Sequence, residues 1–232
     1  MVLSAHQPHF IPWLGYFNKV AKSDTFVWLE DVQFRKNYFQ NRSKIKANQE
    51  ELWLTLPVKK GKLNENINEI ELVKGREFLK ILKTIKNYYS KTPYFEDHFL
   101  DIEILISNSN TSLSDLNFEL FHYFLTVLDI KTKIVRSTNL QLEKTDPNNR
   151  LIEICNKLNA KKYIAGKGGR NYMNENLFKE NNIEILWQNF PINEIQYQQT
   201  KGEFINGLSI LDVLFNVGKD KTRELVNTSW KN

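Results

Sequence analysis

The chain has 232 residues, a formal net charge of +5, 41% hydrophobic residues and 12% aromatic residues. This length and composition are typical of a globular protein with its own core, and argue against disorder. Such a mild charge does not by itself indicate a nucleic-acid-binding protein. The single cysteine, Cys155, excludes an intrachain disulfide and a cysteine-based zinc site, and no spacing of His, Asp and Glu suggests another metal. We expect one domain over residues 1–232.

The N-terminal segment does not look like a signal peptide. It lacks a cationic start, and its apolar run is interrupted by His6, Gln7 and His9. Elsewhere, no stretch approaches the roughly 20 apolar residues that a membrane span needs. The sequence therefore predicts a cytoplasmic protein without a membrane span.

The first thirty residues predict a strand, a helix and a second strand. Val2–Ala5 is a short apolar run, and Thr25–Leu29 is rich in β-branched and aromatic residues. Between them, Pro12 suits the first turn of a helix. Helical spacing then follows in Trp13, Tyr16, Phe17 and Val20. Because the helix must cross over between the two strands, this order favours a parallel sheet.

The segment of about residues 38–73 predicts an antiparallel extension of the fold. Tyr38–Lys46 and Glu51–Val58 have the pattern of a hairpin around Asn48–Gln49. Ile67–Val73 could add a further strand. This segment would lie beside the parallel sheet as an insertion.

The rest of the chain alternates helices and strands. Strands are predicted at Lys133–Ser137, Lys162–Ala165 and Glu184–Gln188. Helices are predicted over Arg76–Tyr89, from Asp146 to about Leu158, and near Asn174–Glu180. Another runs from a capping box at Ser112 and Asp115 to about Leu128. The last runs from a second capping box at Ser209 and Asp212 to Asn216, and Gly218 ends it. This alternation is typical of an α/β protein with a Rossmann-like, mostly parallel sheet, flanking helices and an antiparallel hairpin insertion.

His6 and Gln7 follow the first predicted strand, at the edge where open α/β sheets bind ligands. An imidazole at this edge can act as a general base near neutral pH, and the Gln7 amide can fix a carbonyl or a hydroxyl group. The alternative is that His6 only hydrogen-bonds a loop. His9 is a further candidate in the same loop.

The segment Asp31–Asn37 follows the second predicted strand, so it begins at the same edge of the sheet. Its side chains suit a phosphorylated or carboxylated ligand, and the alternative is a solvated charged loop. They comprise a carboxylate, amides and two cations, namely Asp31, Gln33, Asn37, Arg35 and Lys36.

Two further segments offer groups for an anionic ligand. Gly166 and Lys167 begin a glycine-containing loop whose backbone N–H groups could face an anion, although the pattern matches neither the P-loop nor the dinucleotide fingerprint. On a predicted strand, alternate residues share a face that is either basic and ligand-facing or a solvated edge that discourages aggregation. These residues are Gln40, Arg42, Lys44 and Lys46, and for Lys46 we favour the solvated edge.

Two residues that look reactive have simpler interpretations. Asp212 lies in an apolar helix, and a capping box with Ser209 explains its position. Cys155 lies among apolar residues of a predicted helix and is interpreted as part of the core.

Several segments have a characteristic order along the chain. They are His6–Phe17, Asp31–Phe34, Gln40–Arg42, Trp53–Val58, Tyr163–Gly166 with Tyr172, and Leu208–Gly218. In this combination they resemble the WbqC-like family over nearly the whole chain. That family tends to have a His-Pro-x-Tyr-x-Gln stretch before its last segment. Here Ile192–Gln199 keeps the tyrosine and a glutamine but has no histidine, so no role for a histidine there is carried over.

The resemblance implies a place in surface polysaccharide and O-antigen gene clusters, with transfer of glycine as a suggested activity. An amine or hydroxyl of a sugar would attack an activated acyl or aminoacyl group, with His6, Gln7 and Asp31 as catalytic residues. The expected partners are a nucleotide-activated or lipid-linked amino sugar and an acyl donor, conceivably an aminoacyl-tRNA, and no cofactor is identified. Substrate-binding residues would be His9, Tyr16, Gln33, Arg35, Lys36, Asn37, Gln40, Asn41, Arg42, Gly166 and Lys167.

The start of the chain is also similar to nucleotidyltransferases of the HIGH type, although Pro12–Tyr16 stands where those enzymes have His-x-Gly-His. An ATP-dependent ligase or nucleotidyltransferase is therefore one alternative, and release of pyrophosphate would favour it. A non-catalytic nucleotide or sugar binder is another. Binding that survives His6→Ala, without turnover, would favour the binder.

Overall fold

The fold is described from a computed structural model that covers the chain except residues 60–63, 144, 201 and 231–232. Among the described residues, five parallel strands form one sheet in the order β5-β2-β1-β6-β7. This is the 3-2-1-4-5 order of a Rossmann-like sheet, so the predicted fold class is confirmed. The strands are β1 (Val2–His6), β2 (Thr25–Trp28), β5 (Lys133–Arg136), β6 (Lys162–Ala165) and β7 (Glu184–Trp187).

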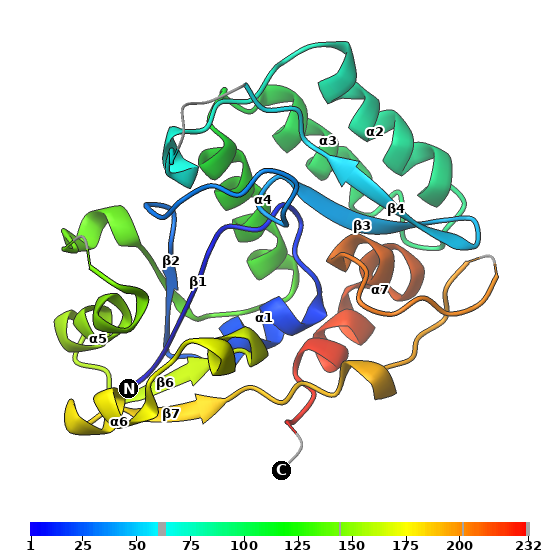
Figure 1. The fold of residues 1–232 in the computed structure, drawn as a ribbon. Helices are drawn as coiled ribbons and strands as arrows, with labels where there is room; N and C mark the ends of the chain where they lie inside the picture. Colours follow the sequence, from blue (N-terminus) through cyan, green and yellow to red (C-terminus); the bar gives the residue numbers. More distant parts are fainter. Residues whose placement is uncertain (60–63, 144, 201, 231–232) are drawn as a thin grey trace.

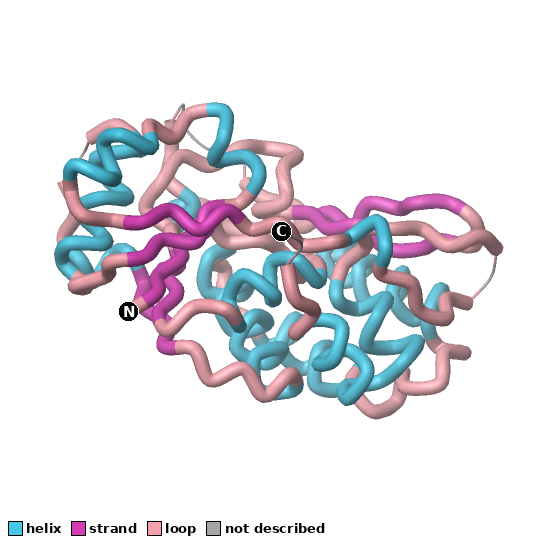
Figure 2. Tube along the Cα trace, turned by 90° about the horizontal axis from the view of Figure 1, so that it is seen from below, coloured by secondary structure: helices cyan, strands magenta, loops and turns pink. Residues whose placement is uncertain are grey.

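Helices cover both faces of the sheet (Figures 1 and 2). Side chains of β2 alternate between two hydrophobic clusters, with Phe26 and Trp28 in the larger cluster and Val27 in the smaller one. Helices α1 (Leu14–Ala21), α4 (Leu113–Val127) and α7 (Ile210–Val226) contribute to the larger cluster. The smaller cluster packs under α5 (Pro147–Lys157) and α6 (Glu175–Glu180). A single central strand thus shares in both cores, as expected for a sheet buried on both faces.

The predicted hairpin forms a separate two-stranded ribbon beside the sheet (Figure 2). Its strands are β3 (Arg42–Ala47) and β4 (Glu50–Thr55), and Asn48 makes the turn in the left-handed region with φ 59°. Two helices, α2 (Arg76–Tyr89) and α3 (Phe99–Asn108), complete this part of the structure. The hairpin confirms the antiparallel insertion, of which residues 60–63 lie outside the described residues.

The predicted strand at Ile67–Val73 is wrong. Ile67–Glu69 is a single 3-10 turn, closed by the Glu69 carboxylate, which accepts a hydrogen bond from the Asn66 backbone N–H at 2.7 Å. Leu72 then pairs with Val58 only through an isolated bridge. Helix α3 was not predicted from the sequence, because its apolar residues include both buried ones and the exposed Leu100 and Ile104, which obscures a helical stripe.

The two predicted capping boxes differ in outcome. Ser112 does cap α4, because its hydroxyl accepts from the Asp115 N–H at 3.2 Å. The box at Ser209 and Asp212 is wrong, because the Ser209 hydroxyl has no partner and the Asp212 carboxylate binds tyrosine hydroxyls instead. The helical segment that begins at Ile210 does end at Gly218, whose φ of 75° is non-helical, and a second helical segment follows it within α7.

The end of α7 packs against α1. The Asn18 side-chain amide of α1 donates to the backbone oxygens of Val226 and Thr228 at 2.7 and 2.9 Å, and Trp230 donates to Asn18 at 2.7 Å. The C-terminal helix is thereby fixed beside the helix that follows the first strand (Figure 1). No helix among the described residues is long and apolar enough to cross a membrane.

Candidate functional site

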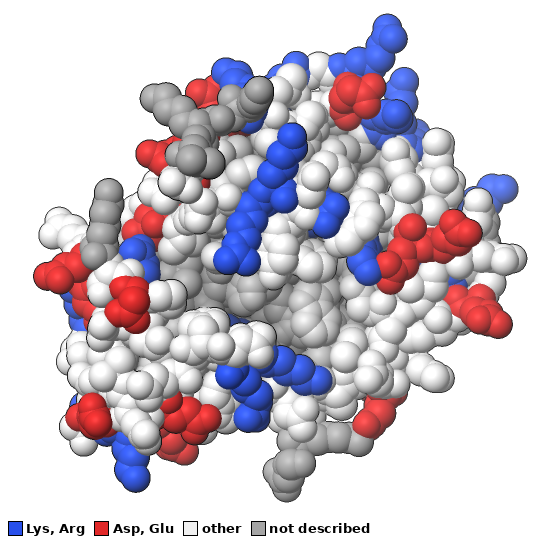
Figure 3. Space-filling view, viewed as in Figure 1, with Lys and Arg blue, Asp and Glu red and all other residues white. Residues whose placement is uncertain are grey.

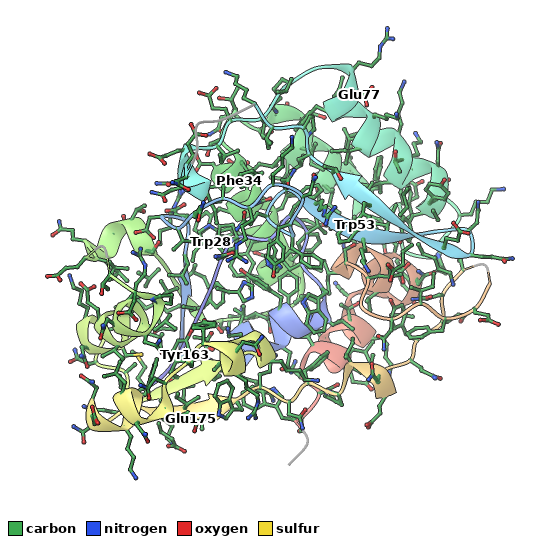
Figure 4. The ribbon with its side chains drawn as sticks, viewed as in Figure 1. Trp28, Phe34, Trp53, Glu77, Tyr163 and Glu175 are labelled. Carbon is green, nitrogen blue, oxygen red and sulfur yellow. The ribbon has the colours of Figure 1, made fainter. Side chains whose placement is uncertain are left out.

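The candidate site lies where β1 and β6 end. Their neighbours on the two sides continue the sheet in opposite directions, so this is the topological switch point, where open α/β sheets bind ligands. Figure 3 shows a hollow in the middle of this face, with Lys and Arg side chains on two opposite rims. Figure 4 shows Trp53 on the hairpin above it and Tyr163 of β6 below. The hollow separates the hairpin from the edge of the sheet.

His6 ends β1 and is held in one tautomer. Its Nδ1 donates to the backbone oxygen of Gln7 at 2.9 Å, which leaves the lone pair on Nε2. Burial, and then the positive charge of Lys19, lower the pKa of His6 to about 3. The ring is therefore uncharged near neutral pH. Tyr16 donates its hydroxyl to the same Gln7 oxygen at 3.1 Å and so helps to fix this turn.

His9 is buried in the loop that follows, with 6% of its surface exposed. Its ring stacks on Phe39 and meets the ring of His6 edge-on, with centroids 5.3 and 4.6 Å apart. Neither ring nitrogen has a hydrogen-bond partner among the described residues. Burial, His6 and Lys19 together hold the pKa of His9 well below its usual value. A buried imidazole without partners is costly and therefore suggests a ligand.

Lys19 completes this group, and sequence reasoning missed it. The residue lies on α1 with 5% of its surface exposed, and its Nζ donates to the backbone oxygen of Ala5 in β1 at 2.9 Å. Burial lowers the pKa of this amine to about 7. Lysines on short amphipathic helices usually lie at the surface. The available signal was its position three residues after Tyr16, which places both side chains on one side of α1.

A chain of amides links the end of β1 to the hairpin. Gln40 donates to the Gln7 side-chain oxygen at 2.8 Å and accepts from the Arg35 backbone N–H at 2.6 Å. The backbone oxygen of Gln40 accepts from Asn117 of α4 at 2.8 Å. Asn41 donates to the backbone oxygen of Leu56 at 3.0 Å. Gln40 and Asn41 are both buried, so they position the entry to β3.

The cations of the hairpin differ in their surroundings. The Arg42 guanidinium lies 4.0 Å from the centroid of the Trp53 ring, and Lys44 lies 5.2 Å from the same ring while pairing with Glu51. Lys46 is buried, and its Nζ donates to Gln199 at 3.1 Å. The solvated-edge interpretation of Lys46 is therefore wrong, because its amine bonds to a segment that folds back over the hairpin.

The remaining candidates lie in the segments that follow β2 and β6. Arg35, Lys36 and Asn37 are exposed, and Gln33 donates to Asn64 at 2.8 Å. Gly166 and Lys167 begin a 3-10 turn at the end of β6, and the nearby Arg170 stacks over Trp187 at 4.4 Å. Arg35, Lys36 and Lys167 are exposed to solvent.

Asp31 lies at the end of β2 and is held by two partners. Its carboxylate pairs with Arg150 of α5 at 2.6 Å and accepts from the Ser137 hydroxyl. Within the described residues, no hydrogen bond or ion pair connects Asp31 or Gln33 to His6. The structure thus brings His6, Gln7, His9, Tyr16 and Gln40 together, and leaves Asp31 in a neighbouring polar cluster.

Two other residues that could look reactive, Asp212 and Cys155, are buried within the protein. Asp212 is buried, with its two carboxylate oxygens accepting from Tyr89 at 2.8 Å and from Tyr197 at 2.6 Å, and burial raises its pKa. Cys155 is buried in the smaller core, which raises the pKa of its thiol to about 12. No group of three His, Cys, Asp or Glu among the described residues could hold a metal ion.

The strand order and the buried basic group at the end of β1 define a Rossmann-like α/β protein with a candidate ligand site at its switch point. The chain belongs to the WbqC-like protein family, whose model matches residues 7–224. It is 33% identical over 223 residues to the uncharacterised protein Rv1507c of Mycobacterium tuberculosis. The aligned region covers 92% of this chain and 93% of that protein. No solved structure was found to match the chain.

Proposed function

We propose that this protein is a cytoplasmic transferase that moves an acyl or aminoacyl group, such as glycyl, to a sugar used in O-antigen or surface polysaccharide synthesis. The observation that carries the proposal is the state of His6. It is an uncharged imidazole in a fixed tautomer, with its Nε2 lone pair left at the carboxyl end of β1. Membership of the WbqC-like family supports the biosynthetic setting.

In this reaction a hydroxyl or amine of the sugar attacks the acyl carbon of an activated donor. The new bond joins the sugar oxygen or nitrogen to that carbon, and the bond from the carbon to the leaving group breaks. His6 would accept the proton of the attacking group at Nε2. With a pKa of about 3 the protonated ring gives up its proton readily, so we propose that it passes the proton to the leaving group.

The rim of the hollow would bind the activated sugar. Arg42 is held against Trp53 at 4.0 Å, which fixes the guanidinium before any ligand arrives. Arg35, Lys36 and Lys167 are exposed cations in the segments that follow β2 and β6. Together they suit the phosphates of a nucleotide-activated or lipid-linked sugar.

A test is to incubate the purified protein with nucleotide-linked amino sugars and a set of acyl donors, including acyl-CoA, glycine with ATP, and glycyl-tRNA. Mass spectrometry would detect the acylated sugar. We expect His6→Asn to lower the rate by about 10²–10⁴-fold, the usual contribution of a general base. The control His122→Asn, on α4, should keep the rate. Equal rates in both variants would contradict the role of His6.

A second candidate is nucleotidyl transfer or ATP-dependent ligation. The strand order β5-β2-β1-β6-β7, with a histidine-containing loop after β1, favours it. Pyrophosphate release from ATP without acylated sugar in the same assay would support this candidate. Binding of a nucleotide-sugar with no turnover on any donor would support a non-catalytic binder.

A further inference from the structure

Three basic side chains lie at the end of β1 without an acidic partner among the described residues; His9 and Lys19 are buried and His6 is half-buried. His6 comes from β1, His9 from the loop after it, and Lys19 from α1. The charge of Lys19 lowers the pKa of both histidines, and no carboxylate contributes to the pKa of any of the three. Burying bases without counter-charges destabilises the empty protein. We call these three residues the basic cluster.

A small pocket lies beside His9, the member of the basic cluster that lines it. Its other lining residues come from the loop after β1, from β3 and from the start of α7, and its volume is about 10 Å³. That is room for roughly one oxygen atom. The polar side chains that line it are His9, Ser43, Lys44 and Ser209.

The polar atoms of this pocket lack partners. Both ring nitrogens of His9 and the hydroxyls of Ser43 and Ser209 are buried and make no hydrogen bond among the described residues. All three side chains can donate hydrogen bonds. Ser209 also precedes the first turn of the 17-residue helix α7, whose N-terminus favours negative charge.

The backbone of the loop is strained beside this pocket. Ile11, two residues after His9, is buried with φ 46°, a left-handed conformation that β-branched residues rarely adopt. The backbone N–H of Phe10 donates a hydrogen bond to the backbone oxygen of Phe39 at 2.8 Å, and this bond holds the loop in place. Strain of this kind gathers at functional sites, where the surrounding structure enforces it.

The remaining titratable groups around the pocket do not supply a negative charge to the basic cluster. Tyr16 of α1 and Tyr38 lie against His9. Lys44 of β3 lines the pocket and pairs with Glu51 of β4, so these two charges offset each other. Among the described residues, the pocket lining therefore offers hydrogen-bond donors and bases but no free carboxylate.

We propose that His9, Ser43 and Ser209 bind an oxygen of a phosphate or carboxylate group of the substrate, and that His9, whose two ring nitrogens have no other partner among the described residues, takes up a proton when this anion binds. A negative charge in the pocket stabilises the protonated form of each nearby base, so the proton comes from the solvent on binding. The inference names the chemical class recognised by the site in the proposed function, and it does not require turnover.

The histidines offer a direct test by ¹⁵N NMR. The chain has four of them, and His98 and His122 lie outside the site as internal controls. Assignment would use His6→Asn and His9→Asn. On titration with inorganic phosphate, and separately with acetate, the ring nitrogens of His9 should move toward protonated or hydrogen-bonded values while those of His98 and His122 stay unchanged. Unchanged His9 signals at saturating anion would overturn the proposal.

Calorimetry tests the donors and the proton. Phosphate and acetate would be titrated in two buffers of different ionisation enthalpy, which gives the number of protons taken up. We expect uptake by the wild type, and a loss of affinity of about tenfold for each of Ser43→Ala and Ser209→Ala. The control Ser90→Ala removes an exposed hydroxyl and should bind normally. The better-bound anion identifies the group.

Three results would overturn the inference. They are an absence of binding by both anions, binding without proton uptake, and binding that is unaffected by the paired Ser43→Ala and Ser209→Ala changes. Circular dichroism would confirm that each variant is folded. Anion binding with these features but without acyl transfer would leave the inference standing and contradict only the proposed function.

Discussion

The side-chain nitrogen of Lys19 donates to the main-chain oxygen of Ala5 at 2.9 Å, so a buried amine rests on the strand that ends in His6. Burial lowers its pKa from 10.5 to about 7. Between these two pH values the unfolded chain binds a proton that the folded chain does not. The stability of the wild type should therefore rise with pH across this window, by up to about 1.4 kcal/mol per pH unit.

Lys19→Met removes this titration. We expect the free energy of unfolding of the variant, relative to the wild type, to increase as the pH falls from 10.5 to 7, and to stay level below that range. A constant offset of about 1–2 kcal/mol comes from the lost hydrogen bond to Ala5. Urea unfolding at several pH values measures the difference. Lys22→Met, at the exposed end of the same helix, is the control for the loss of a lysine side chain; a flat difference for Lys19→Met would contradict the assigned pKa.

The carboxylate of Asp212 on α7 accepts hydrogen bonds from Tyr89 of α2 and from Tyr197. Its substitution measures how much these buried hydrogen bonds contribute to stability. Asp212→Ala leaves the hydroxyls of Tyr89 and Tyr197 without their acceptor, and we expect a loss of about 2–5 kcal/mol in unfolding free energy. Asp220 lies on the same helix with 83% of its side chain exposed, so Asp220→Ala should change stability by no more than about 0.5 kcal/mol. Chemical denaturation compares the two, and similar small losses would show that the network contributes little.

Gly15 allows the Trp13 ring to fold back over α1. A Cβ at this position would lie 2.2 Å from the indole. Gly15→Ala should displace the ring and cost about 1–3 kcal/mol. Gly75→Ala is the matched control, because a Cβ there meets nothing within 4 Å. Thermal unfolding gives the stabilities. Since Trp13 also lines the pocket with His9, phosphate binding should weaken in the Gly15 variant alone.

The pairing of Asp31 with Arg150 predicts energetic coupling between β2 and α5. A double-mutant cycle with Asp31→Asn and Arg150→Met should give an interaction energy of about 1–3 kcal/mol, because both side chains are largely buried. The exposed pair of Lys131 and Asp129, taken through the same cycle, should give a much smaller interaction energy, because solvent screens it. A coupling no larger than that of the exposed pair would indicate that Asp31 is not held by Arg150 in solution.

The sheet could be predicted from sequence because each strand is a short local pattern. The buried residues of Val2–Ala5 and of Lys162–Ala165 are adjacent in sequence, and Asp146 caps α5 by accepting from the backbone N–H groups of Asn148 and Asn149. His6 and Gln7 follow from the rule that ligands bind at strand ends. Local patterns therefore gave the fold class and the edge of the sheet that holds the candidate site.

The remainder depends on contacts between distant parts of the chain. Asp212 looked like a helix cap because its partner Tyr89 is 123 residues away. Lys19 looked like a surface residue because its burial depends on packing against the end of β1. Nothing local indicates that Asp31 faces Arg150. Such roles are fixed only by tertiary packing, which overrides local preference.

Asn18 has a consequence for the order of events in folding. Its amide binds the backbone oxygens of Val226 and Thr228, which lie 208 and 210 residues away, and Trp230 binds it in return. Lys19 is the next residue of the same helix, so the helix that supports the first strand is held by a very distant segment of the chain. Contacts between distant segments carry the largest loop-closure cost. We expect the packing of α1 against the end of α7 to form late in folding.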